Sequence, residues 1–315
     1  MEAINRILVV LDPYTAPTSK AQPAMDTGIT LAREIGAELH FGLVQYNNQL
    51  TGKSSAMAQA RETFMQTWRE WLADCISKLD TDGVAQVQAH LEWDHPWHDG
   101  ILRQAMKLEA DLVIKDIHHH PRWGKSMFTN TDWHLVRECP TALLMLKSGH
   151  WHKPPRILAA VDPMHERDKP AALDHRIVDH AKLLRDAIAG ELSVFHAFQP
   201  VLNRIPVEAG GIPLDLPIEQ DAKAIESAHR EALDALLANR ECEAEEVILE
   251  TGSPADTLIA RIEDHSIDLV VMGAIARGAL KRLFLGSTAE RVFGELSADL
   301  LVVKPADFEC PVDLH

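Results

Sequence analysis

The stretch Arg6-Ile7-Leu8-Val9-Val10-Leu11-Asp12-Pro13 returns 150 positions later as Arg156-Ile157-Leu158-Ala159-Ala160-Val161-Asp162-Pro163. Two more pairs recur 157 positions apart: ADLVI at 110–114 matches IDLVV at 267–271, and residues 139–147 match 296–304 in pattern. One match can arise by chance, but three in the same order indicate a duplicated domain. The difference of 157 − 150 = 7 residues must fall between the first and fourth strands. We predict domains at 1–149 and 150–315.

Each half alternates short apolar runs with stretches of helical periodicity. In the second half we expect strands at 156–161, 191–198, 244–249, 268–272 and 300–304, and helices at 170–189, 218–238, 254–263 and 287–296. The first half repeats this pattern, with helices at 23–35, 54–79 and 96–108. Such alternation implies right-handed βαβ crossovers and a parallel sheet covered on both faces. We therefore predict an α/β fold of two tandem, doubly wound, five-stranded parallel-sheet domains.

Composition narrows the classes of function. The 315 residues include 31 Lys and Arg against 47 Asp and Glu, a net charge of −16, and 46% are hydrophobic. An acidic chain lacks the basic surface that nucleic acids or anionic membranes attract, and no apolar run approaches the ~18–20 residues of a membrane span. Its four cysteines are scattered, and its first twelve residues resemble a strand rather than a signal peptide. We expect a cytoplasmic protein that neither binds nucleic acid nor inserts into membranes.

In sheets of this type, ligands bind beyond the carboxyl ends of the strands, where the strand order reverses. In the second half, Val161 and Asp162 follow the first strand, and Met272 and Gly273 end the fourth. Glycines there allow backbone amides to approach an anion, and the free N–H groups at the start of the helix from Ser287 favour phosphate. The alternative is that Gly273 is a turn residue and that Ser287 is only a helix cap.

The spacing Gly273-x-x-Ala276-(nine residues)-Gly286-Ser287, between a Val-Val-Met strand and an Ala-Glu-Arg-Val helix, resembles the universal stress protein family. The ATP-binding pattern of that family is Gly-x-x-Gly-(nine)-Gly-Ser/Thr. The duplication, Thr-Asp-Trp-His at 131–134 and Pro-Val-Asp at 311–313 resemble its tandem, E-type members. The resemblance implies Rossmann-like domains of the adenine nucleotide alpha hydrolase type. It also implies that the last strands, 142–146 and 300–303, lie near each other.

The resemblance further implies that the second half binds ATP or a related adenine nucleotide. The phosphate loop would comprise Gly273, Gly286 and Ser287, with Val161 and Asp162 near the adenine or ribose and Arg277 neutralising phosphate. The implied binding residues are Val161, Asp162, Met272, Gly273, Ala276, Arg277, Gly286, Ser287 and Thr288. Ala276 departs from the family pattern: in a left-handed conformation its Cβ costs roughly 1–2 kcal/mol, which weakens binding about tenfold. In an ordinary conformation its methyl group crowds a phosphate oxygen.

In the first half, the offset of 157 places Asp116 at the position of Gly273 and Thr129 at that of Gly286. A carboxylate there repels phosphate, so we expect this half to bind no triphosphate. The same half is rich in histidines, and His118, His120 and His134 are candidate ligands for zinc or another transition metal. The alternatives are an exposed neutral loop, a buried network around Trp133, and a cluster that titrates at acid pH.

No nucleophile has a general base at a readable spacing, so we assign no catalytic residue. The leading hypothesis is a cytoplasmic stress-response protein that acts by binding a ligand, with a protein partner or homodimerisation left open. One alternative is a slow ATPase, for which Arg277 or Lys281 would supply the counter-charge. Another is a scaffold, or a carrier of a metal or apolar ligand in the first half. The stripe Phe64, Trp68 and Trp71 is typical of packing, with an apolar channel as the alternative.

Overall fold

The computed structural model describes residues 3–12, 23–117, 129–147, 150–164, 172–199, 218–274 and 287–314. The chain divides into two compact units. Unit 1 comprises Met1–His150, Gly278–Phe284 and Asp299–His315, and unit 2 comprises Trp151–Arg277 and Leu285–Ala298. The last strand of the second sequence half therefore packs within unit 1.

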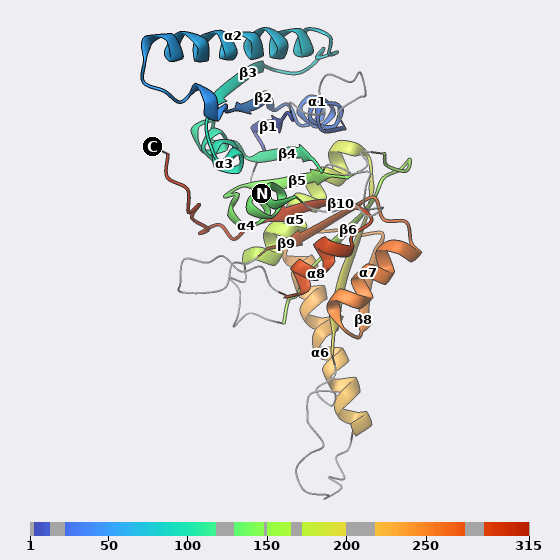
Figure 1. Cartoon of the computed structure of the whole chain (residues 1–315). Helices are drawn as coiled ribbons and strands as arrows, with labels where there is room; N and C mark the ends of the chain where they lie inside the picture. The colour runs from blue at the N-terminus through green and yellow to red at the C-terminus, as the bar shows by residue number, and fades with distance from the viewer. Residues whose placement is uncertain are drawn as a thin grey trace, which may run out of the picture. The chain divides into compact units, whose positions relative to one another are not determined.

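Unit 1 contains a sheet in the order β3-β2-β1-β4-β5-β10. The first five strands are parallel: β1 (Arg6–Val10), β2 (Glu38–Gln45), β3 (Val87–Trp93), β4 (Leu112–Asp116) and β5 (Ala142–Leu146). The connecting helices are α1 (Pro23–Ile35), α2 (Ser55–Ser77), α3 (Trp97–Lys107) and α4 (Asn130–Glu138), and a short 3₁₀ turn, η1 (Asn48–Leu50), follows β2. Figure 1 shows α2 lying along β3 at the outer edge of this sheet.

Unit 2 repeats the alternation, with strands in the order β9-β6-β7-β8. These strands are all parallel: β6 (Arg156–Ala160), β7 (Glu191–Phe198), β8 (Glu246–Thr251) and β9 (Leu269–Gly273). Its helices are α5 (Ala172–Ile188), α6 (Ile218–Asn239), α7 (Pro254–Asp264) and α8 (Ser287–Glu295). The prediction of an α/β fold of two tandem domains with mostly parallel strands is confirmed, although, among the described residues, β10 places six strands in unit 1 and four in unit 2 instead of five in each.

The repeat is visible in the element boundaries. Four elements of the first half recur with an offset of 157: α3, β4, α4 and β5 correspond to α7, β9, α8 and β10 (Asp299–Val303). By contrast, β2 begins at Glu38 and β7 at Glu191, an offset of 191 − 38 = 153. Three of the seven extra residues therefore lie before β7, and four lie between β7 and α7.

The last strands of the two sequence halves pair with each other. β10 runs antiparallel to β5, with Leu301 opposite Leu144 and Val302 opposite Leu143. All four side chains are buried, so the pairing is sealed by apolar packing as well as by the hydrogen-bond ladder. The prediction that these strands lie near each other is confirmed.

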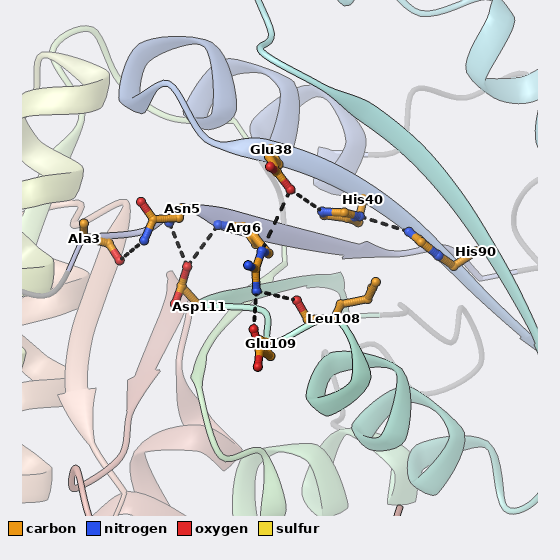
Figure 2. Close-up of polar contacts among 9 residues, drawn as sticks. All are labelled: Ala3, Asn5, Arg6, Glu38, His40, His90, Leu108, Glu109 and Asp111. Atoms are coloured by element: carbon orange, nitrogen blue, oxygen red, sulfur yellow. Dashed lines mark hydrogen bonds and ion pairs between the residues drawn. The ribbon is translucent and has the colours of Figure 1, made fainter.

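A polar cluster fixes the amino end of β1 (Figure 2). Asp111 Oδ2 accepts hydrogen bonds from the backbone N–H groups of Asn5 (2.7 Å) and Arg6 (3.0 Å). The Arg6 guanidinium donates to the Leu108 carbonyl (3.2 Å), just after α3, and pairs with Glu109 (2.7 Å). The cluster thus ties the start of the first strand to the end of a helix about 100 residues further along the chain.

Unit 2 builds a similar cluster around two residues that the repeat predicts, with His152 as a donor because Pro155, at the position of Asn5, has no N–H. Asp268, at the position of Asp111, accepts from the backbone N–H groups of His152 (3.1 Å) and Arg156 (2.8 Å). Arg156, at the position of Arg6, donates to the His265 carbonyl (3.0 Å) after α7. The duplication therefore conserves a strand-anchoring device as well as the order of the elements.

Replacing Asp268 with alanine is expected to lower the free energy of unfolding by about 1.5–3 kcal/mol, because two backbone donors lose a charged acceptor. Asp268 is buried, with 7% of its surface exposed. Urea unfolding followed by circular dichroism measures the change. Asp80→Ala is the matched control, since the Asp80 side chain is 83% exposed and is expected to contribute little. Equal effects of the two substitutions would contradict the anchoring role.

Candidate functional site

The carboxyl ends of β6 and β9 lie side by side in unit 2, at the point where the strand order reverses. β6 pairs with β7 on one side and with β9 on the other, and Ala160 is in register with Met272. Val161 and Asp162 continue β6, while Gly273 ends β9. Val161 and Met272 are buried, whereas the Asp162 side chain is 39% exposed. Four of the predicted binding residues are thus brought to one edge, where doubly wound sheets bind ligands.

The remaining predicted residues are only partly described. Ala276, Arg277 and Gly286 lie outside the described residues. Ser287 and Thr288 form the beginning of α8. The prediction that a helix opens at Ser287 is confirmed.

Gly273 has a packing role. A Cβ atom at this position would lie 2.8 Å from Leu173 Cδ2 and 3.2 Å from Ile177 Cδ1, both on α5. Separations this short force a neighbour to move, so the glycine allows α5 to pack closely on the end of β9. Its presence is therefore explained without a ligand, and its role in binding stays a prediction.

A histidine pair lies next to the same edge and was missed by the sequence analysis. His196 on β7 is 1% exposed, and its Nδ1 lies 3.1 Å from the Val161 carbonyl. Because a carbonyl only accepts, His196 Nδ1 carries a proton, and His196 Nε2 shares a second hydrogen bond with His229 Nδ1 at 2.7 Å. His229, on α6, also stacks on Phe198 with ring centroids 4.4 Å apart. The sequence does show a lone histidine, His196, in an apolar strand. It does not show the partner, because His229 lies 33 residues further along the chain.

In unit 1, a buried ion pair lies at the corresponding edge. Lys115, near the end of β4, donates from Nζ to Asp132 Oδ1 on α4 and to the Asp116 carbonyl, both at 2.8 Å. The two charged side chains are 2% and 0% exposed, and the ammonium group lies 5.6 Å from the centre of the Trp97 ring. Removing either member of such a buried pair strongly destabilises the fold, because the remaining charge is left buried without a partner.

The same Asp132 carboxylate also caps its own helix. Its Oδ2 accepts from the backbone N–H and the hydroxyl of Thr129, each at 2.8 Å, and Thr129 Oγ1 accepts from the Asp132 N–H at 3.2 Å. This reciprocal capping box places a negative group at the N-terminus of α4, where the helix dipole favours an anion. The Asp132 carboxylate thus occupies the position at the start of α4 where an anionic ligand would otherwise be favoured.

Asp116 serves a neighbouring helix: its Oδ1 accepts from the backbone N–H of Ala24 (3.0 Å) in the first turn of α1. The offset of 157 places Met272, Gly273 and Ala289 of unit 2 at the positions of Lys115, Asp116 and Asp132. All the charged groups of the unit 1 arrangement are therefore replaced by uncharged residues in unit 2. The sequence analysis singled out Asp116 but missed Lys115 and Asp132, although a lysine in an apolar strand was a visible signal.

Of the three candidate metal ligands, His118 and His120 lie outside the described residues. His134 stacks on His98, with ring centroids 3.9 Å apart, and its Nδ1 lies 3.0 Å from Glu138 Oε1. Burial lowers the pKa of His98, and the neighbouring His134 lowers it further, while Asp99 acts in the opposite direction. Within the described ranges, no group of three or more His, Cys, Asp or Glu residues is arranged to hold a metal ion.

These features define a class of protein: a duplicated α/β protein in which the carboxyl edge of one unit holds a buried Lys–Asp pair, and the matching positions of the other unit hold uncharged residues. The family model described as the universal stress protein family matches residues 3–147 and again residues 155–304. The chain belongs to the universal stress protein family. In the part of the chain that the structure covers, no helix is long and apolar enough to span a membrane.

Some relatives match nearly the whole chain and others match about half of it. Universal stress protein E of Escherichia coli (strain K12) is 28% identical over 322 residues, which cover 100% of this chain and 98% of the relative. The crystal structure of a protein of unknown function from Pseudomonas aeruginosa PAO1 has a TM-score of 0.70 at 24% identity, over 97% of this chain and 94% of that chain. A universal stress protein solved in complex with cAMP matches 48% of this chain and 96% of its own, at 23% identity and a TM-score of 0.31.

Proposed function

We propose that this universal stress protein acts in the cytoplasm mainly by binding a ligand, and that its second domain, residues 150–315, binds ATP or a related adenine nucleotide. The observation that carries the proposal is the contrast between the two carboxyl edges. Unit 1 places the Lys115–Asp132 pair at the start of α4, whereas unit 2 has Met272 and Ala289 at those positions. Ala289 leaves the start of α8 without the carboxylate that caps α4, although the first turn of α8 carries Glu290 at the next position. The start of α8 is therefore suited to an external anion at the position that Asp132 fills in unit 1.

The proposed site orients the nucleotide along this edge. The phosphates would lie against Gly273, Gly286 and the start of α8, with Val161 and Asp162 near the ribose or adenine. Arg277 would neutralise phosphate charge. Because the chain carries a net charge of −16, the attraction must come from local amides and a helix end rather than from the overall field. No catalytic residue is part of the proposal, and residues 1–149 form a domain that does not bind triphosphate.

Ala276→Gly is expected to tighten ATP binding about tenfold, because it removes a Cβ that costs roughly 1–2 kcal/mol or crowds a phosphate oxygen. Isothermal titration calorimetry with ATP measures the change. Ala238→Gly, at an exposed position on α6, is the matched control and should leave ATP affinity unchanged. Absence of ATP binding by both the wild type and Ala276→Gly would overturn the proposal.

A further inference from the structure

A cavity of about 520 Å³ lies at the carboxyl end of β2 in unit 1. Its walls come from two segments: residues 44–48, which include the end of β2, and residues 94–97, which lead into the first residue of α3. The lining residues with polar or aromatic side chains that could contact a ligand include Gln45, Tyr46, Asp94, His95 and Trp97. Its volume is within the range of pockets that hold small organic molecules.

The first clue to an occupant is an unpaired amide. Gln45 lines the cavity and is 7% exposed, and its Nε2, which is shielded from solvent, has no hydrogen-bond partner among the residues that the structure describes. A buried donor without an acceptor is costly, so such groups are rare in native proteins. The terminal torsion of a glutamine side chain is soft, so the amide can turn toward the cavity at little cost. A ligand that supplies a carbonyl or another acceptor would remove this penalty.

The second clue is a row of aromatic rings that ends at the cavity. Trp71, Trp68 and Phe64 follow one another along α2 with centroids 5.5 and 6.2 Å apart, and Phe64 meets Trp93 of β3 at 6.0 Å. Trp93 in turn contacts Tyr46 at 5.3 Å. The predicted stripe on α2 therefore packs on itself and on Trp93.

At the cavity itself, Tyr46 stacks on His95 with centroids 4.5 Å apart and an interplanar angle of 19°. Trp97 is held by a hydrogen bond from its indole N–H to the Val44 carbonyl (3.1 Å). Tyr46 is 36% exposed, so part of its ring surface is accessible. Fixed aromatic rings of this kind favour a flat ligand.

The third clue is that the one carboxylate among the described lining residues is already paired. Asp94 is that carboxylate. Its Oδ1 accepts from the His95 N–H (2.7 Å), and its Oδ2 accepts from Arg103 (2.6 Å). Arg103 also donates to the Asp313 carbonyl (2.8 Å) and forms an ion pair with Asp99. Its guanidinium is therefore held by Asp94, Asp99 and Asp313. A carboxylate already satisfied in this way calls for no cationic ligand.

We propose that this cavity binds a small, uncharged heteroaromatic amide, whose carbonyl accepts from Gln45 Nε2 and whose ring packs against Tyr46 and His95. The site is independent of the proposed nucleotide site, because all its residues belong to unit 1 and none of them is a proposed nucleotide ligand. Nicotinamide has the required features, a flat ring and a neutral carboxamide, and serves as the probe. Nicotinate is its charged counterpart.

The test is titration of the full-length protein with nicotinamide, followed by saturation-transfer NMR and calorimetry. We expect the wild type to bind nicotinamide and to bind nicotinate at least tenfold more weakly. Gln45→Met, which keeps the length of the side chain but removes the donor, should weaken nicotinamide binding at least tenfold. Gln59→Met, at an exposed position on α2, is the matched control and should bind as the wild type does.

Thermal melting separates a loss of binding from a loss of folding. Because Gln45→Met removes an unpaired buried donor, its melting temperature should equal or exceed that of the wild type while binding is lost. Tyr46→Ala provides a second variant, at a half-exposed position, and should also weaken binding. Failure of the wild type to bind nicotinamide, equal binding by Gln45→Met, or equal affinity for nicotinate would overturn the proposal. None of these outcomes bears on ATP binding.

Discussion

Replacing Lys115 with methionine is expected to lower the free energy of unfolding by about 3–5 kcal/mol. The substitution leaves the Asp132 carboxylate, which is 0% exposed, without its ammonium partner. Methionine is the residue that the repeat places at the same position in unit 2, so the side chain itself suits this fold. Urea unfolding followed by circular dichroism measures the loss.

The double variant Lys115→Met/Asp132→Ala provides the control, because it installs both unit 2 residues. Asp132→Ala alone should also be strongly destabilising, with about 1 kcal/mol of its effect due to the lost helix cap at Thr129. In the double variant no unpaired charge is left buried, so its loss should be clearly smaller than the sum of the two single losses. If the loss of unfolding free energy in the double variant equalled the sum of the two single losses, the ion pair would not couple the end of β4 to α4.

The reciprocal transfer should abolish nucleotide binding. Met272→Lys/Ala289→Asp introduces the unit 1 pair into unit 2, where the new carboxylate would occupy the helix start proposed for phosphate. Like charges that meet at a binding site cost several kcal/mol, so ATP affinity is expected to fall at least about 100-fold. Calorimetric titration with ATP, alongside a thermal melt to confirm folding, measures this effect.

A neutral pair of similar size, Met272→Gln/Ala289→Asn, separates charge from bulk. It fills the same space without a carboxylate, so we expect a smaller loss of ATP affinity than with the charged pair. Unchanged affinity in the charged variant would contradict the proposed position of the phosphates.

Much of the fold was predictable because duplication leaves its record in the sequence. The matches at 6–13 and 156–163 located the first strand of each half. The long helix expected at 54–79 begins as predicted, with Ser54 as its N-cap. The outer strands were less well predicted: β8 begins at Glu246, two residues later than the expected residue 244. These strands are only partly buried and mix polar with apolar residues, so the pattern marks their ends poorly.

The site was harder to predict, because its chemistry depends on contacts between distant residues. Lys115 and Asp132 are 17 positions apart, and His196 and His229 are 33 apart, so no local spacing reveals either pair. That Gln45 Nε2 lacks a hydrogen-bond acceptor can be recognised only when the positions of the surrounding described residues are known. Glycine at 273 was visible in the sequence, but its packing against α5 required the structure.

The most direct test of the account is the number of ATP molecules bound per chain at saturation, measured by calorimetry or equilibrium dialysis on the full-length protein. Unit 1 has Lys115, Asp116 and Asp132 where unit 2 has Met272, Gly273 and Ala289. This contrast predicts one ATP per chain, and none in Met272→Lys/Ala289→Asp. Two equivalent sites per chain would contradict the assignment of the first domain. No binding by either the wild type or Ala276→Gly would contradict the assignment of the second.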